Sequence, residues 1–146
     1  MRTLSHTPVL KDLLLNHPSP DNLHIMPTTR DPNSQLALSS RNAYLTPAEL
    51  SVAPALYHAL SSVKAAYEAN SDITAEEILS NARASIESIK ADGVDIKLDY
   101  IQIFNKDDFE LVSGPIGAGR ELVVAGAMWV GKTRLIDNLL LGWKCD

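Results

Sequence analysis

The stretch Leu122-Val123-Val124-Ala125-Gly126-Ala127-Met128-Trp129 decides the fold of this chain. It is a short apolar run that follows a glycine-rich segment, and runs of this kind are typical of buried strands. A second strand is predicted over 98–104, where β-branched and aromatic side chains are concentrated. Beyond them lies the stretch 133–143, for which we expect a short last helix.

Two segments before these strands have strong helix-start signals. Thr46-Pro47-Ala48-Glu49 is a capping box with proline at the first helical position, and it opens a helix expected to end near Asn70. Thr74-Ala75-Glu76-Glu77 is a second capping box, and the helix that it opens would end at Gly93. Both helices have apolar residues at helical spacing, namely Leu50, Ala53, Leu56, Leu60 and Val63 in the first and Ile78, Leu79, Ala82, Ile86 and Ile89 in the second. We therefore expect residues 43–146 to form a small α+β domain with two main helices against an antiparallel sheet.

Residues 1–42 show a different pattern. A short helix is expected over 3–15, and the proline-rich stretch 17–21 stops it, because proline disfavours helix in the residue before it. A strand candidate follows at 23–26, and then a polar loop. This order is typical of the end of a doubly wound α/β domain, in which ligands sit beyond the carboxyl ends of the strands. Because one strand makes no sheet, we expect residues 1–42 to be an α/β remnant of a Rossmann-like nucleotide-binding domain, whose exposed apolar side chains would invite a partner.

Size and composition exclude several classes of protein. At 146 residues, the chain is one domain, or a small domain with part of another. The net charge of −5 argues against a general nucleic-acid binder, because such affinity comes from clustered Lys and Arg. The single cysteine, Cys145, excludes an intrachain disulfide, and the histidines lack metal-ligand spacing, so we predict no metal site. No secretory signal and no apolar span of about 20 residues is recognisable, which favours a cytoplasmic protein without a membrane partner.

The stretch Leu36-Ala37-Leu38-Ser39-Ser40-Arg41-Asn42 is the candidate site for chemistry. Two adjacent hydroxyls and a guanidinium on one loop suit the phosphates of a nucleotide. Hydroxyls and backbone N–H groups can hold phosphate oxygens, and Arg41 can neutralise their charge through a bidentate contact. Serine and asparagine between a strand and a helix are also ordinary turn residues. Taken alone, the loop therefore leaves a binding role and a turn-forming role open.

The loop also resembles the signature loop of the pantothenate synthetase (pantoate–β-alanine ligase) family, which belongs to the nucleotidyl transferases with HIGH and KMSKS motifs. Three stretches support the resemblance, in the family's order: Thr28-Thr29-Arg30-Asp31-Pro32, Leu38-Ser39-Ser40-Arg41 and Gly131-Lys132-Thr133-Arg134-Leu135-Ile136-Asp137-Asn138. Members of the family use ATP and Mg²⁺ to activate pantoate as pantoyl adenylate, with release of pyrophosphate. The amine of β-alanine then attacks the acyl group, which gives pantothenate and AMP.

The resemblance implies roles for single residues. Arg41 and Ser40 would be catalytic, because the loop closes over ATP and Arg41 would stabilise the charge on the leaving pyrophosphate. The main chain at Thr29 would contact the adenine. Gln35 stands where the family has glycine, and because glutamine resists a positive φ, we expect the closing motion of the loop to be altered. The implied ATP-binding residues are Thr29, Leu38, Ser39, Ser40 and Arg41.

The other half of the family's site is not found in this sequence. That half has a His-x-Gly-His helix start, glutamines that hold pantoate and a Gly-x-Lys-Asp segment, none of which matches here. The resemblance therefore implies a truncated, carboxyl-terminal part of the enzyme, with residues 43–146 as a lid domain. Such a chain would be inactive alone. Its partner would be a separate amino-terminal half or a second copy of the chain.

Two alternatives stay open. One is a non-catalytic binding or interaction module derived from the enzyme. The other is a P-loop nucleotidase, because the residues 126–133 match the Walker A pattern G-x-x-x-x-G-K-[ST] letter by letter. The bulky residues between its two glycines instead favour a strand. The polar residues Arg134 and Asp137 just after this match are interpreted as a structural contact within the expected last helix.

Overall fold

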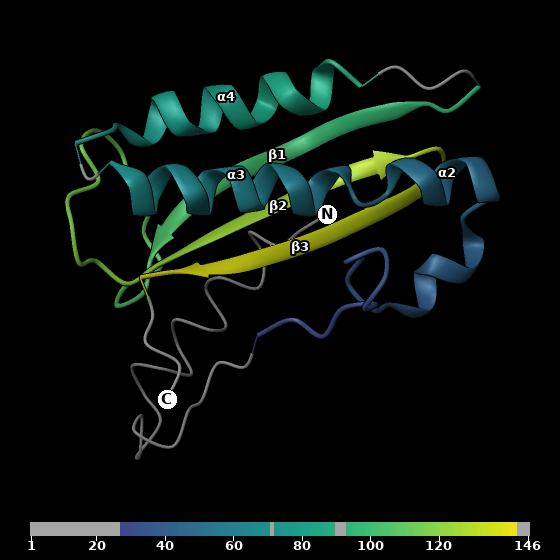
Figure 1. Cartoon of the computed structure of the whole chain (residues 1–146), viewed down its shortest axis with the longest axis horizontal. Coiled ribbons are helices and arrows are strands. Elements are labelled where there is room, and N and C mark those ends of the chain that lie inside the picture. The colour runs from purple at the N-terminus through teal and green to yellow at the C-terminus, as the bar shows by residue number, and fades with distance from the viewer. Residues whose placement is uncertain (1–26, 71, 90–92, 143–146) are drawn as a thin grey trace.

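The computed structural model describes residues 27–70, 72–89 and 93–142. Within these residues, helices α3 and α4 cover one face of an antiparallel sheet (Figure 1). The helix and the strand predicted over 3–15 and 23–26 lie outside the described residues, and the division of the chain after residue 42 stays a prediction. The elements are η2 (Ser40–Tyr44), α2 (Pro47–Val52), α3 (Ala55–Ala69), α4 (Ala75–Glu87), β1 (Ile96–Asn105), β2 (Leu122–Val130) and β3 (Thr133–Leu141).

The sheet has the strand order β1-β2-β3, so the apolar β2 is its central strand. Both strands predicted from composition are confirmed as β1 and β2. In the register of the sheet, Gly126 lies between Ile101 of β1 and Asp137 of β3. This pairing places the polar Asp137 on the same face as the buried Ile101, the face that the helices cover.

The prediction of a last helix over 133–143 is wrong, because Thr133–Leu141 is the strand β3. Gly131, with a φ of 57°, forms a tight turn that pairs Val130 with Thr133 and starts a β-hairpin. The structural contact expected between Arg134 and Asp137 is wrong for the same reason. Residues three apart on a strand point to opposite faces of the sheet, whereas on a helix they would be neighbours.

The first predicted helix is two helices, α2 and α3, which meet at Ala53 and Pro54. Its start is confirmed: the Thr46 side chain accepts a hydrogen bond from the Glu49 backbone N–H at 3.2 Å, and the Glu49 carboxylate accepts one from the Thr46 N–H at 2.8 Å. The second predicted helix is α4, which ends at Glu87, before the predicted stop at Gly93. The two helices expected to pack on the sheet are therefore α3 and α4.

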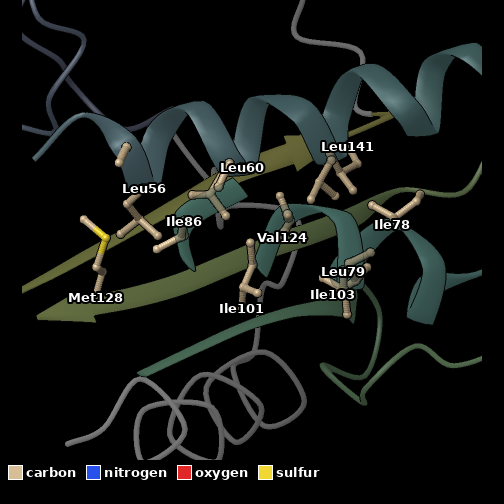
Figure 2. Packing of buried hydrophobic residues seen from close by; sticks show 14 of the residues in the cluster. Leu56, Leu60, Ile78, Leu79, Ile86, Ile101, Ile103, Val124, Met128 and Leu141 are labelled. Atoms are coloured by element: carbon tan, nitrogen blue, oxygen red, sulfur yellow. The ribbon is translucent and has the colours of Figure 1, made fainter. Parts of the chain in front are cut away.

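A cluster of buried side chains fills the space between the helices and the sheet, as Figure 2 shows. Through this cluster, α3 packs over β2 and β3. The labelled members of the cluster are Leu56 and Leu60 of α3, Ile78, Leu79 and Ile86 of α4, Ile101 and Ile103 of β1, Val124 and Met128 of β2, and Leu141 of β3.

No helix in the described ranges is long and apolar enough to cross a membrane.

Candidate functional site

The candidate loop follows the second arm of a small hairpin, which lies on the β3 side of the sheet (Figure 1). The Leu38 N–H donates to the Thr29 carbonyl at 2.9 Å, and Arg30 pairs with Ala37 as an antiparallel bridge. The turn of this hairpin is held by Asp31, whose carboxylate accepts hydrogen bonds from the Ser34 N–H at 2.7 Å and the Ser34 hydroxyl at 2.9 Å. An aspartate that binds backbone N–H groups just after it is a common way to fix a tight turn.

The pKa of Asp31 gives this turn a pH dependence. The Ser34 backbone N–H, with further help from the Ser34 hydroxyl, lowers the pKa of the Asp31 carboxyl below its ordinary value. A lowered pKa in the folded state means that the stabilisation is complete above the ordinary aspartate pKa of about 3.9 and is lost as the pH falls through the lower folded value. We expect the Ser34 amide to lose protection from hydrogen exchange in that acid range. An Asp31→Asn variant should show no such step, and a step that persists in it would contradict the assignment.

Gln35 occupies the position where a glycine was expected, and it adopts the left-handed conformation with a φ of 61°. Its backbone N–H donates to the Asp31 carbonyl at 2.9 Å, and its side-chain amide donates to the Pro32 carbonyl at 3.2 Å. These bonds offset part of the strain of a positive φ in a residue with a Cβ atom. The hairpin therefore keeps a glycine-like backbone without the glycine.

Gln35→Gly should stabilise the chain by about 0.5–1 kcal/mol, because relief of the left-handed strain outweighs the added freedom of glycine in the unfolded state. Urea denaturation measures the change as a shift in midpoint at constant slope. Gln35→Ala is the matched control, since it removes the side-chain amide and keeps the strained φ. If the glycine variant is no more stable than the alanine variant, the strain is absent.

The sequence-predicted phosphate-binding residues Ser39, Ser40 and Arg41 are solvent-exposed. Ser39 caps η2, and its hydroxyl accepts a hydrogen bond from the Arg41 backbone N–H at 3.2 Å. The Asn42 side-chain amide donates to the Ala37 carbonyl at 2.9 Å and so closes the base of the loop. Among the described residues, the Arg41 guanidinium has no hydrogen-bond or ion-pair partner. The backbone of the loop is thus held by hydrogen bonds, and the Arg41 guanidinium has no partner within the described part of the chain.

A pocket of about 360 Å³ opens between this loop, the start of α3 and the outer edge of β3. Its wall includes the buried Leu56 and the half-buried Tyr57 on one side and Arg41 on another. Of the predicted site residues, the structure brings Leu38, Ser39 and Arg41 to the pocket, whereas Thr29 and Ser40 are not part of its lining. The lining residues are Thr28, Leu36, Ala37, Leu38, Ser39, Arg41, Asn42, Ala53, Leu56, Tyr57, Ala125, Arg134, Leu135, Ile136, Asp137 and Asn138.

Arg30, which the sequence did not single out, lies next to the candidate loop. Its guanidinium forms a bidentate ion pair with the Asp137 carboxylate, at 2.5 and 2.8 Å, and lies 4.3 Å from the centre of the Tyr57 ring. The two charged side chains are only 12% and 5% exposed. The signal was present, since Arg30 and Asp137 both fall within the stretches that resemble the family. The wrong helix prediction for 133–143 hid their pairing.

The Walker A match is not a phosphate-binding loop. Its residues 126–130 lie within β2 and pair with β1 and β3, Gly131 and Lys132 form the hairpin turn, and Thr133 begins β3. A P-loop needs successive backbone N–H groups that curl around an anion, and here the strand residues are committed to the sheet ladders. The geometry therefore overturns the P-loop alternative.

The described residues also offer no evident metal ligands. No group of three or more His, Cys, Asp or Glu side chains in 27–70, 72–89 or 93–142 is placed to hold a metal ion.

Comparison with known proteins supports the resemblance to the pantoate–β-alanine ligase family along most of the chain. The sequence pattern of the family described as Pantoate-beta-alanine ligase matches residues 3–140. A relative named Pantothenate synthetase from Thermotoga neapolitana is 37% identical over 123 residues, which are 80% of this chain and 38% of the relative. One of the same name from Caulobacter vibrioides is 41% identical over 119 residues, with 80% of this chain and 38% of the relative covered.

A solved structure shows the same relationship. The crystal structure of pantothenate synthetase from Thermus thermophilus superposes with a TM-score of 0.69 at 28% sequence identity, and it covers 91% of this chain and 45% of that chain. This chain thus spans less than half the length of each of these relatives. With the family pattern, the sequence identity and the fold in agreement, the chain belongs to the pantoate-beta-alanine ligase family.

Proposed function

We propose that this chain supplies the phosphate-binding side of a pantothenate synthetase site, in which ATP activates pantoate as an adenylate and β-alanine then takes the acyl group. The observation that supports this best is the exposed, unpartnered Arg41 guanidinium beside the Ser39 and Ser40 hydroxyls, within the described part of the chain. These groups lie on a loop whose backbone is already fixed by hydrogen bonds. Fixed donors next to a free cation are what a site needs to receive phosphate oxygens without reorganising.

The proposed chemistry assigns each loop residue a role. The carboxylate of pantoate attacks the α-phosphorus of ATP, the bond to the β,γ-pyrophosphate breaks, and pyrophosphate leaves. Ser39 and Ser40 would donate hydrogen bonds to phosphate oxygens, and Arg41 would contact the leaving pyrophosphate through its planar fork. A preorganised donor at developing charge is typically worth about 3–4 kcal/mol of transition-state stabilisation. Thr29, whose carbonyl accepts a hydrogen bond from the Leu38 N–H, would contact the adenine through its main chain.

The rest of the site would come from groups that do not occur in this sequence, since no His-x-Gly-His motif is found in it. We propose that residues 1–42 belong with the nucleotide-binding part of the enzyme and that residues 43–146 act as its lid. A site built from two sides needs both sides for chemistry, because positioning of the reactants supplies much of the rate. The chain by itself would then show little or no ligase activity.

A chimera tests the proposal. The matching segment of the Caulobacter vibrioides relative, which is 41% identical, is replaced by residues 27–142 of this chain. The folded chimera should form pantothenate and AMP from pantoate, β-alanine and ATP. The parent enzyme and a version without the segment are the controls. A chimera that melts cooperatively but forms no pantothenate would overturn the proposal.

A further inference from the structure

The Arg30 guanidinium joins three separate parts of the molecule. Besides the bidentate contact with Asp137 of β3, it donates to the Asn138 carbonyl at 3.1 Å and to the Gln35 carbonyl of its own hairpin at 3.3 Å. The guanidinium also lies over the Tyr57 ring of α3 and makes a cation–π contact with it. The planar fork of arginine can make these contacts together, and a lysine ammonium cannot reproduce them.

Arg30 also lies at the base of the phosphate-binding loop. It is bridged to Ala37, the residue immediately before Leu38, and the Leu38 N–H is bonded to the neighbouring Thr29 carbonyl. The Asn42 side chain returns to the Ala37 carbonyl and so ties the end of the loop to the same point. Any shift of Arg30 relative to β3 is therefore passed directly to the residues 38–41.

The Arg30–Asp137 ion pair is less exposed to solvent than the two surface ion pairs Arg134–Asp99 and Lys106–Glu121. In the Arg134–Asp99 pair the aspartate is 39% exposed, and in the Lys106–Glu121 pair both side chains are more than a third exposed, at 37% and 40%. The Asp137 carboxylate is 5% exposed and its partner 12%. A buried bidentate ion pair fixes the orientation of its two side chains relative to each other, whereas exposed ion pairs contribute little to stability.

We propose that the Arg30–Asp137 pair is a latch that positions the 38–41 loop, and Arg41 with it, against the edge of β3. Arg30 and Asp137 are positioning residues that act through Arg41 and do not touch the phosphates. Their effect on catalysis rests on the proposed function, but their effect on the loop does not. A misplacement of about 1 Å at a reacting group can cost about 10²-fold in rate, which is why such a latch matters.

Hydrogen exchange on the purified chain tests the latch without any assay of activity. Arg30→Lys keeps the charge and loses the fork, so the Leu38 amide should lose protection by about tenfold or more while the Val124 amide in β2 keeps its own. The double variant Arg30→Met with Asp137→Leu removes both charges and leaves no buried charge unpaired, and it should show the same local loss. Lys106→Gln, which breaks an exposed pair, is the control. Unchanged protection of the Leu38 amide in both folded variants would overturn the proposal that the Arg30–Asp137 pair positions the loop.

A double-mutant cycle in the chimera tests the link to Arg41. Arg30→Lys should lower kcat for pantoate-dependent pyrophosphate exchange by about 10–100-fold in the presence of Arg41, and only slightly once Arg41 is alanine. Equal losses in both backgrounds would contradict positioning through Arg41. If Arg41→Ala alone changes nothing, the proposed function fails, and the hydrogen-exchange result still decides whether the latch holds the loop.

Discussion

Arg41→Ala is expected to lower pantoate-dependent exchange of labelled pyrophosphate into ATP by about 10²–10³-fold in the chimera, the loss typical of one preorganised donor at developing charge. The free energy of unfolding should stay within about 0.5 kcal/mol of the parent, because Arg41 is exposed and has no partner among the described residues. The exchange rate and a urea melt of the same preparation measure the two quantities.

Two matched variants make the result specific. Arg41→Lys keeps the positive charge without the planar fork and should give an intermediate rate. Lys132→Ala removes another exposed cation, at the hairpin turn of the Walker A match, and should leave the exchange rate unchanged. Loss of exchange in the Lys132 variant, or full exchange in the Arg41→Ala variant, would contradict the role given to the loop.

Asp137→Ala is expected to destabilise the chain by about 3–5 kcal/mol, because it leaves the Arg30 guanidinium buried without its counter-charge. The lost bidentate contact also frees the hairpin that Arg30 holds to β3. Chemical denaturation followed by circular dichroism measures the change in the free energy of unfolding.

Asp99→Ala is the matched control, since it also removes an aspartate paired with an arginine across the sheet. The Asp99 side chain is 39% exposed, so water can replace the lost contact of Arg134 and the cost should stay within about 0–1 kcal/mol. Similar costs for the two substitutions would show that burial does not set the strength of the Arg30–Asp137 pair.

The elements with local signals were predictable from the sequence. The capping box at Thr46 starts α2, Thr74 caps α4, and the composition of 98–104 and 122–129 indicates β1 and β2. The strand β3 was not predictable, because residues 133–141 do not alternate between apolar and polar side chains as a half-buried strand does. What decides its structure is the pairing with β2 across the Gly131 turn, a contact between elements rather than a property of residues 133–141.

The site divides in the same way. The exposed residues Ser39, Ser40 and Arg41 could be chosen from their chemistry and their resemblance to the family, and the structure brings Ser39 and Arg41 to one pocket. Arg30 and Asp137 both lie in stretches that resemble the family, but their pairing could not be predicted, because they are 107 residues apart and residues 133–143 were expected to be a helix. The resemblance marked position 35 as one where a positive φ is needed, but the sequence did not show that Gln35 adopts it, with its backbone N–H bonded to the Asp31 carbonyl.

An NMR titration of the chain with magnesium ATP would show whether the 38–41 loop contacts the phosphates of ATP. We expect weak binding, with the largest shifts in the amide signals of Ser39, Ser40 and Arg41, and we expect Arg41→Ala to remove these shifts. Largest shifts in the hairpin 126–133, or loop signals that do not move while the chain stays folded, would contradict this expectation.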